Sequence, residues 1–338
     1  MKATRQSEAP SLGLVGDIGG THCRFAITSL GQNDLGAPAK YPCADFPDIV
    51  HAIGAYLSHE RRKIEWAMIA VAGPAENDEV SLTNLSWHIS GREIAQKFGL
   101  REARLANDFT AISRATPLLE GANLVQVGGP ARPDPSAKVV ATIGAGTGLG
   151  VGGLVTTGAA PFPLSTEGGH TAFAPVEEFD FELLRVLRTR FQRVSNERLL
   201  SGEGLHNIYW AISVLEDAAP EKLEPKEITR RAIAKSDPRC VRAVKVFCRV
   251  LGAVAGDVAL TLGARGGCFV SGGVIHGVMD VFDRAGFREA FESKGRFRPY
   301  MEAIPTWLVT HPYATLLGCA ALAGDVIAPA RAGVSAKV

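Results

Sequence analysis

Two kinds of hydrophobic pattern alternate along the chain. Short apolar runs bounded by glycine or polar residues predict β-strands, and stretches in which apolar residues recur every three or four positions predict helices. Strands are predicted at 12–16, 23–28, 66–72, 103–106, 139–143, 149–155, 267–270 and 306–310. Helices are predicted at 48–60, 90–98, 225–234 and 313–323, from residue 179 onward, and along a long buried stretch through 247–262. This mixture predicts an α/β protein.

Two glycine-rich turns, each between two predicted strands, suggest a first chemical role. Asp17 to Thr21 joins the first pair of strands, and Gly144 to Gly148 joins a later pair. Glycine permits positive φ and leaves backbone N–H groups free to face anionic oxygens, so each turn is a candidate phosphate cradle. Either turn alone would equally suit an ordinary β-hairpin. Their repetition in the two halves of the chain indicates an internal duplication and favours phosphate binding.

Other small and polar residues extend the candidate nucleotide site. Thr21 adds a hydroxyl to the first turn, and Asp17 could hold Mg²⁺ through water. A further small-residue turn, Ser271 to Val274, follows a predicted strand, and a flat nucleoside could lie over it. Alone, this last turn is weak evidence for a nucleotide.

A carboxylate, Asp108, stands where a predicted strand passes into a helix in the segment Ala106 to Ala111. Such a carboxylate, between two phosphate cradles, can take a proton from a hydroxyl while a terminal phosphate is presented to it. Asp and Asn also commonly cap helix N-termini, and a cap needs only one of Asn107 and Asp108. From this segment alone, catalysis and capping both remain open.

Glu167 and His170 flank two glycines, and a further carboxylate follows at Glu197. Glu-x-x-His on a helix can bind iron in bundle proteins, but the two central glycines disfavour a helix and no second copy exists. A loop that presents carboxylate and imidazole to the vicinal hydroxyls of a sugar explains the segment better. His170 taken alone would be more typical of a buried histidine with its hydrogen bonds satisfied.

Length and composition exclude several classes of protein. A chain of 338 residues suits two domains, which leaves room for a cleft. Its 36 basic and 35 acidic residues form no basic run, so we expect neither nucleic acid nor a membrane surface as a main partner. No apolar leader precedes residue 11, and the six cysteines show no metal or redox spacing, so we expect a cytoplasmic protein with buried thiols.

Taken together, these motifs resemble the bacterial glucokinase family of the hexokinase/actin-like ATPase superfamily, from about Leu14 to Ala323. The resemblance implies a two-domain α/β fold with ribonuclease H-like cores and an interdomain cleft. The small domain would comprise 11–117 plus 312–338 and the large domain 118–311. It implies an ATP-dependent hexose kinase that transfers the γ-phosphate to the 6-hydroxyl of glucose, acts with Mg²⁺ and forms a homodimer.

The resemblance also implies a role for each motif residue. Asp108 would be the general base, with Asn107, Glu167, His170 and Glu197 as hexose ligands. ATP would be held by Asp17, Gly19, Gly20, Thr21, Gly144, Gly146, Thr147, Gly148, Gly272 and Gly273, with Mg²⁺ near Asp17 and no tightly bound metal. The related zinc-bearing branch is disfavoured, because no cysteine lies between Cys43 and Cys240.

Two alternatives stay open. The chain could phosphorylate another hexose, such as mannose or fructose. It could also be a non-catalytic sugar sensor or an actin-like assembly protein, because one fold hosts all of these functions. The full set of base and ligand residues favours an enzyme.

Overall fold

The structure is a computed structural model that describes residues 11–331 apart from 74, 76, 83, 84, 158 and 159. The first ten residues, on which the expectation of no leader partly rests, lie outside this range. The described chain divides into two compact units. The first comprises the described residues of Met1–Leu118 and Pro312–Val338, and the second is Leu119–His311.

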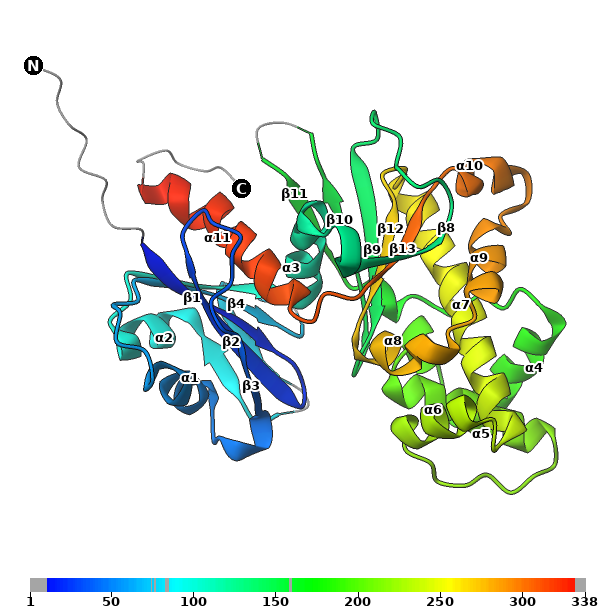
Figure 1. The fold of residues 1–338 in the computed structure, drawn as a ribbon. Helices are drawn as coiled ribbons and strands as arrows, with labels where there is room; N and C mark the ends of the chain where they lie inside the picture. The colour runs from blue at the N-terminus through cyan, green and yellow to red at the C-terminus, as the bar shows by residue number, and fades with distance from the viewer. Residues whose placement is uncertain (1–10, 74, 76, 83–84, 158–159, 332–338) are drawn as a thin grey trace, which may run out of the picture. The chain divides into compact units, whose positions relative to one another are not determined.

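A five-stranded mixed sheet forms the centre of the first unit (Figure 1), in the order β3-β2-β1-β4-β7. Strand β2 pairs antiparallel with both β1 and β3, whereas β4 pairs parallel with both β1 and β7. The strands are β1 Leu12–Ile18, β2 His22–Ser29, β3 Ala39–Pro42, β4 Trp66–Val71 and β7 Glu102–Asn107, with a separate pair β5 Glu79–Ser81 and β6 His88–Ser90. The helices are α1 Ile49–Leu57, α2 Gly91–Phe98, α3 Asp108–Ala115 and α11 Ala314–Arg331.

Helices cover both faces of this sheet. Leu14 packs in one apolar cluster with Ile53 of α1 and Ile94 of α2. Its neighbour Val15 packs in another cluster with Leu316 of α11. Because successive residues of a strand point to opposite faces, a strand that is buried on both sides is a continuous apolar run. This explains why β1 and β4 were recognisable in the sequence.

A six-stranded sheet forms the second unit, in the order β11-β10-β9-β12-β13-β8. Its strands are β8 Leu124–Gly128, β9 Val139–Ala145, β10 Leu149–Val155, β11 Phe162–Thr166, β12 Cys268–Ser271 and β13 Thr306–Val309. Its helices are α4 Glu178–Leu187, α5 Gly202–Leu215, α6 Pro225–Ala234, α7 Pro238–Leu262, α8 Gly273–Val278, α9 Arg284–Glu292 and α10 Arg298–Glu302. The long helix α7 shares a single buried core with α5, α6 and α9 (Figure 1).

The two sheets repeat one plan. In each, the central strand (β1 or β9) pairs antiparallel with the next strand in the chain, which pairs antiparallel with the one after it. On its other side, the central strand pairs parallel with a strand that comes later in the chain, and that strand pairs parallel with a further one. The second sheet adds β8 at the edge beyond β13. The repeated glycine turns had predicted this duplication, and each turn joins the central strand of its sheet to the next.

Several predicted details were incomplete or wrong. The short or half-exposed strands β3, β5, β6, β8 and β11 were not predicted. Helix α11 runs to Arg331 rather than to residue 323, and Asp325, which breaks its apolar pattern, pairs with Arg114. In the helix predicted from residue 179 onward, the apolar Phe181 is 52% exposed.

The expectation about the cysteines can be compared with the described residues. All six cysteines are buried and free, as predicted. Within the described residues, no helix has the length and apolar character needed to cross a membrane.

Candidate active site

The candidate residues of the first unit gather at one edge of its sheet. Ile18, Val71 and Asn107 lie in one row across the parallel strands β1, β4 and β7. The first glycine turn follows β1 directly, and Asp108 follows β7 directly. Parallel strands present their carboxyl ends at the same edge, which is where α/β proteins commonly bind ligands.

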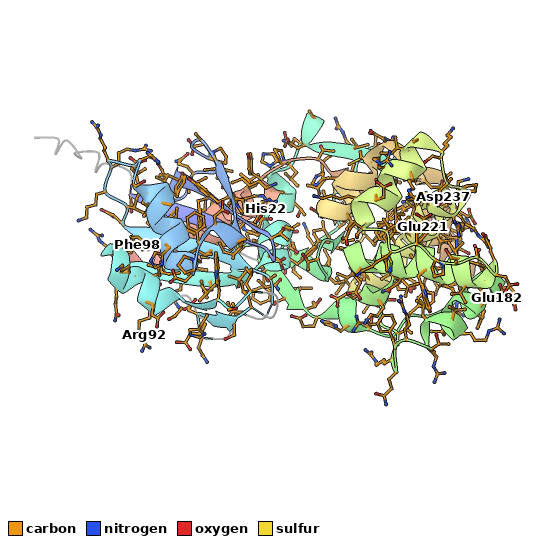
Figure 2. All side chains as sticks on the ribbon, turned by 90° about the horizontal axis from the view of Figure 1, so that it is seen from below. His22, Arg92, Phe98, Glu182, Glu221 and Asp237 are labelled. Atoms are coloured by element: carbon orange, nitrogen blue, oxygen red, sulfur yellow. The ribbon has the colours of Figure 1, made fainter. Side chains whose placement is uncertain are left out.

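The first hairpin carries a mostly buried ion pair. Asp17 faces Arg24 across β1 and β2, and a guanidinium nitrogen lies 2.8 Å from Oδ2 of Asp17. Burial raises the pKa of Asp17 above its ordinary value, and the positive charge of Arg24 opposes that rise. At the exposed tip, the hydroxyl of Thr21 lies 3.0 Å from Nδ1 of His22, which begins β2 (Figure 2). The sequence reasoning missed Arg24.

The structure shows which residue of the segment Ala106 to Ala111 caps the helix, Asn107 or Asp108. The Oδ1 of Asn107 accepts hydrogen bonds from the N–H groups of Phe109 (2.8 Å) and Thr110 (3.2 Å), so Asn107 is the N-cap of α3. Its Nδ2 donates to the carbonyl of Gly73 at 3.2 Å. Asp108 is the first residue of the helix, where a negative charge is favourable. The capping role therefore does not require Asp108.

The second hairpin lies between β9 and β10 in the second unit. The Gly146 N–H donates to the carbonyl of Gly148 at 2.8 Å, and Thr147 is exposed at the tip. Ser271 at the end of β12 pairs with Gly144 of β9, so the turn at Gly272 lies beside this hairpin. The predicted nucleotide-binding residues of this unit are therefore neighbours in the structure.

The glycines of the two hairpins are not needed for positive φ, contrary to the expectation. Gly19, Gly146 and Gly148 all lie outside the left-handed region, whereas Gly272 has φ 113°. A Cβ on Gly272 would also collide with the backbone of Ala145. A Cβ on Gly146 would meet no protein atom within 4 Å. At Gly146, the missing side chain leaves open space instead of relieving backbone strain.

Glu167 and His170 lie on a single 3₁₀ turn, not on an α-helix. The turn, Gly168–His170, follows β11 and packs against β10. A Cβ on Gly168 would come within 2.9 Å of Val151, and one on Gly169 would collide with the carbonyl of Leu149. The glycines thus allow the turn to lie against β10. The side chains of Glu167 and His170 are 57% and 60% exposed, so His170 is not a buried structural histidine.

Glu197 lies against the second hairpin. It belongs to the short turn Asn196–Arg198, and its Oε2 accepts a hydrogen bond from the Leu149 N–H at 3.0 Å. The following segment also contacts the hairpin, because the Gly202 N–H donates to the carbonyl of Gly146 at 2.9 Å. A backbone donor such as the Leu149 N–H leaves no signal in the sequence and could not be predicted from it.

Hydrogen bonds join the segment that carries His170 to the segment that carries Glu197. The Asn196 N–H donates to the carbonyl of Thr171 (2.9 Å), and its side-chain amide donates to the Thr171 hydroxyl (2.9 Å). A guanidinium nitrogen of Arg193 donates to the carbonyl of His170 at 2.8 Å. The structure therefore brings Glu167, His170 and Glu197 together beside the second hairpin.

A cluster of charged groups around Arg231 consists of oppositely charged side chains that pair with one another. Arg231 contacts Glu221, Glu227 and Asp237, of which Glu221 and Asp237 are labelled in Figure 2. Hydrogen bonds from Arg230 and Arg231 lower the pKa of Glu227 to about 2. No group of three His, Cys, Asp or Glu side chains among the described residues could hold a metal ion.

Comparisons with known proteins agree over nearly the whole chain. The sequence model of the family described as Glucokinase matches residues 14–326. A glucokinase from Tolumonas auensis is 44% identical over 308 residues, which cover 91% of this chain and 95% of that protein. The crystal structure of a glucokinase from an Antarctic psychrotroph is 34% identical, with a TM-score of 0.81 over 93% of this chain and 99% of that one.

A more distant solved structure shares the fold. It is a ROK family glucokinase from Streptomyces griseus in complex with glucose and AMPPNP, with 22% identity and a TM-score of 0.65. The match covers 93% of this chain and 100% of that one. The α/β fold with mixed sheets is thus that of known sugar kinases, and the extent of the sequence match shows that the chain belongs to the glucokinase family.

Proposed function

We propose that this chain is an ATP-dependent glucokinase that transfers the γ-phosphate of ATP to the 6-hydroxyl of glucose and yields glucose 6-phosphate and ADP. The observation that carries the proposal is the 44% identity to a glucokinase over 91% of the chain. The local geometry supports it, because each unit gathers its candidate residues at one place.

In this proposal, Asp108 takes the proton from the 6-hydroxyl as that oxygen attacks the phosphorus. Asn107 is the N-cap of α3, and Asp108 stands beside it as the first residue of the helix, at the edge where the strands β1, β4 and β7 end. The amide oxygen of Asn107 accepts two hydrogen bonds from α3, and Nδ2 donates one to the carbonyl of Gly73. The second hydrogen of Nδ2 would donate to a sugar hydroxyl. The exposed Glu167 and His170, with Glu197, complete the hexose ligands.

The two hairpins would hold the phosphates of ATP. The hairpins contain Gly19, Gly20, Gly144, Gly146 and Gly148. The N–H groups of Gly19 and Gly146 donate to carbonyls within their own hairpins, so other N–H groups of the two turns would face the anionic oxygens. The hydroxyls of Thr21 and Thr147 stand exposed at the tips, and Gly272 and Gly273 would face the nucleoside. The Streptomyces griseus enzyme was crystallised with AMPPNP, which supports ATP as the phosphoryl donor.

The residues at the first hairpin fit Mg²⁺. Mg²⁺ prefers oxygen ligands, and Asp17 and Thr21 supply a carboxylate and a hydroxyl there. Only Oδ2 of Asp17 receives a hydrogen bond from the described residues, so Oδ1 remains for the ion or its water. When bound with ATP, Mg²⁺ neutralises charge on the phosphate oxygens.

We further propose that the two units are the small and large domains of a hexokinase/actin-like ATPase with ribonuclease H-like cores. The repeated strand order supports this assignment. By family resemblance, the enzyme would be a cytoplasmic homodimer.

A hexose panel tests the proposed function. ADP formation should be measured with ATP and Mg²⁺ in the presence of glucose, mannose, fructose or no sugar. We expect glucose to give the highest kcat/KM and the reaction without sugar to be negligible. A higher kcat/KM for mannose or fructose would identify another hexose kinase. Glucose binding without ADP formation would identify a sensor and refute the proposal.

A further inference from the structure

The hydrogen bond between Glu197 and Leu149 connects two parts of the proposed site that sequence reasoning had kept separate. Glu197 is a proposed hexose ligand, whereas Leu149 follows directly after the proposed nucleotide hairpin. The bond runs from the Leu149 N–H to Oε2 of Glu197, and both residues belong to the second unit.

The two ends of Glu197 are held by different elements. Its main chain follows Asn196, which is tied to Thr171 by the two hydrogen bonds described above. Its carboxylate is held by Leu149, whose position is fixed because it pairs with Ala145 across the hairpin. From the described residues, Oε1 receives no hydrogen bond, so it stays available to accept one from a sugar hydroxyl.

The absence of a side chain at Gly148 makes this arrangement possible. A Cβ on Gly148 would collide with Oε2 of Glu197, and its other near neighbour is the carboxyl carbon of the same side chain, at 3.4 Å. Gly148 has no positive φ, so an alanine there introduces no backbone strain of that kind. The collision can be relieved by rotation of the flexible Glu197 side chain, which would remove its carboxylate from Leu149.

We propose that the second glycine hairpin positions Glu197 for the hexose, and that Gly148 is therefore a determinant of glucose affinity as well as part of the nucleotide site. This inference rests on the proposed function, because it takes Glu197 as a hexose ligand. A carboxylate that is free to rotate must be ordered when the sugar binds, and ordering it costs affinity. Leu149 keeps the carboxylate in place beforehand.

Alanine at two positions of the same hairpin gives a matched test. Glucose dissociation constants should be measured by calorimetry without nucleotide for wild type, Gly148→Ala and Gly146→Ala. We expect Gly148→Ala to weaken glucose binding roughly tenfold or more, since hydrogen bonds to charged groups commonly carry such factors. Gly146→Ala, whose Cβ would meet open space, should leave glucose binding close to wild type and act on ATP instead.

A double-mutant cycle shows whether the effect passes through Glu197. In a Glu197→Ala background no carboxylate remains to be displaced, so adding Gly148→Ala should change the glucose dissociation constant little further. An effect of Gly148→Ala that persists undiminished in this background would overturn the proposal. So would unchanged glucose binding in Gly148→Ala, or equal weakening by both single alanines.

Two controls keep the result interpretable. Melting curves show whether each variant is folded. If Gly148→Ala is not, amide hydrogen exchange at Leu149 tests the anchor directly: glucose should slow it in the nucleotide-free wild type, and Glu197→Ala should accelerate it. Unchanged exchange in both cases would refute the proposal. If the wild type itself binds no hexose, the proposed function fails, and that outcome is distinct from all of these.

Discussion

Asn107 and Asp108 are adjacent in the sequence, yet the structure gives them different environments. The Asn107 side chain accepts two hydrogen bonds from the first turn of α3 and donates one to Gly73. Asp108 begins the helix without being its cap. The Phe109 N–H also donates to Oδ1 of Asp108 at 2.9 Å, but the Asn107 oxygen accepts from both Phe109 and Thr110 and is the cap of the helix.

Replacing Asp108 by Asn should reduce kcat by roughly 10²–10⁴-fold, as expected when a general base is removed. The amide keeps the size of the carboxylate but cannot accept the proton, so glucose affinity measured by calorimetry should stay near wild type. Asn107→Ala provides a contrasting variant, because it removes the cap and should lower the stability of the fold by about 1 kcal/mol. Wild-type turnover in Asp108→Asn would leave that residue no catalytic role.

The residue types of the candidate site were predictable, but their contacts were not. Carboxylates, imidazole and glycine turns carry chemistry that can be recognised without coordinates. The Leu149 N–H and the pairing of Thr171 with Asn196 depend on which segments the fold brings together. The role expected for the hairpin glycines, positive φ, was wrong because the open space at Gly146 is not visible in a sequence.

At the scale of elements, predictability followed burial. Strands β1, β4 and β9 are buried and lie in the middle of their sheets, so apolar runs bounded by turns revealed them. The edge strands β8 and β11 are largely half-exposed, and the mixed pattern that results resembles a loop. Helix α7 was predictable from its apolar period, but the sequence did not show that its Arg249 reaches α4.

That contact is a buried ion pair between Asp180 of α4 and Arg249 of α7. The Asp180 side chain is 2% exposed and accepts hydrogen bonds from two guanidinium nitrogens, one of them at 2.9 Å. It also accepts from the N–H groups of Val176 and Glu177, in the segment that leads from Thr171 into α4. Burial alone would raise the pKa of Asp180, but the bonds from Arg249 and Glu177 outweigh it and lower the pKa.

Asp180→Asn should destabilise the fold by about 3–5 kcal/mol at pH 7, because it leaves the buried Arg249 without its main partner. The pKa of Asp180 is lower in the folded than in the unfolded protein. The stability that Asp180 contributes to the fold is therefore fully present above its unfolded pKa of about 3.9. It is lost as the pH falls through the lower pKa of the folded protein. The difference between wild type and variant in thermal midpoint should consequently shrink below about pH 4.

A surface ion pair serves as the control for this pH series. Glu227→Gln makes the same change from acid to amide in the exposed network around Arg230 and Arg231. Exposed pairs contribute little, so its midpoint should stay close to wild type at pH 7. If Asp180→Asn were no less stable than Glu227→Gln, the ion pair between α4 and α7 would not support the fold.

At the scale of the whole molecule, the last described helix returns to the first unit. Helix α11 follows the second unit in sequence but packs with β1, β2 and β4 of the first (Figure 1), where it covers Val15, Ala26 and Trp66. Arg114 of α3 and Asp325 of α11 form an ion pair with nitrogen to oxygen distances of 2.5 and 3.1 Å. The last helix thus supports α3, which begins at the proposed catalytic base.

Replacing glycine by alanine should have opposite effects at two positions of α11, Gly318 and Gly324. A Cβ on Gly318 would collide with the carbonyl of Ala111 in α3, whereas one on Gly324 would lie 3.5 Å from Gly31, an ordinary contact. Gly318→Ala should therefore destabilise the first unit by about 1–3 kcal/mol, as overpacking does. Gly324→Ala should stabilise it by about 0.5–1 kcal/mol, because alanine is the better helix former.

Since α3 carries Asp108 at its start, displacement of α3 from α11 should also lower kcat in Gly318→Ala but not in Gly324→Ala. Thermal melting and steady-state kinetics on both variants test this. Equal stability and turnover in the two would mean that the close packing of α11 on α3 neither holds the unit together nor positions its carboxylate.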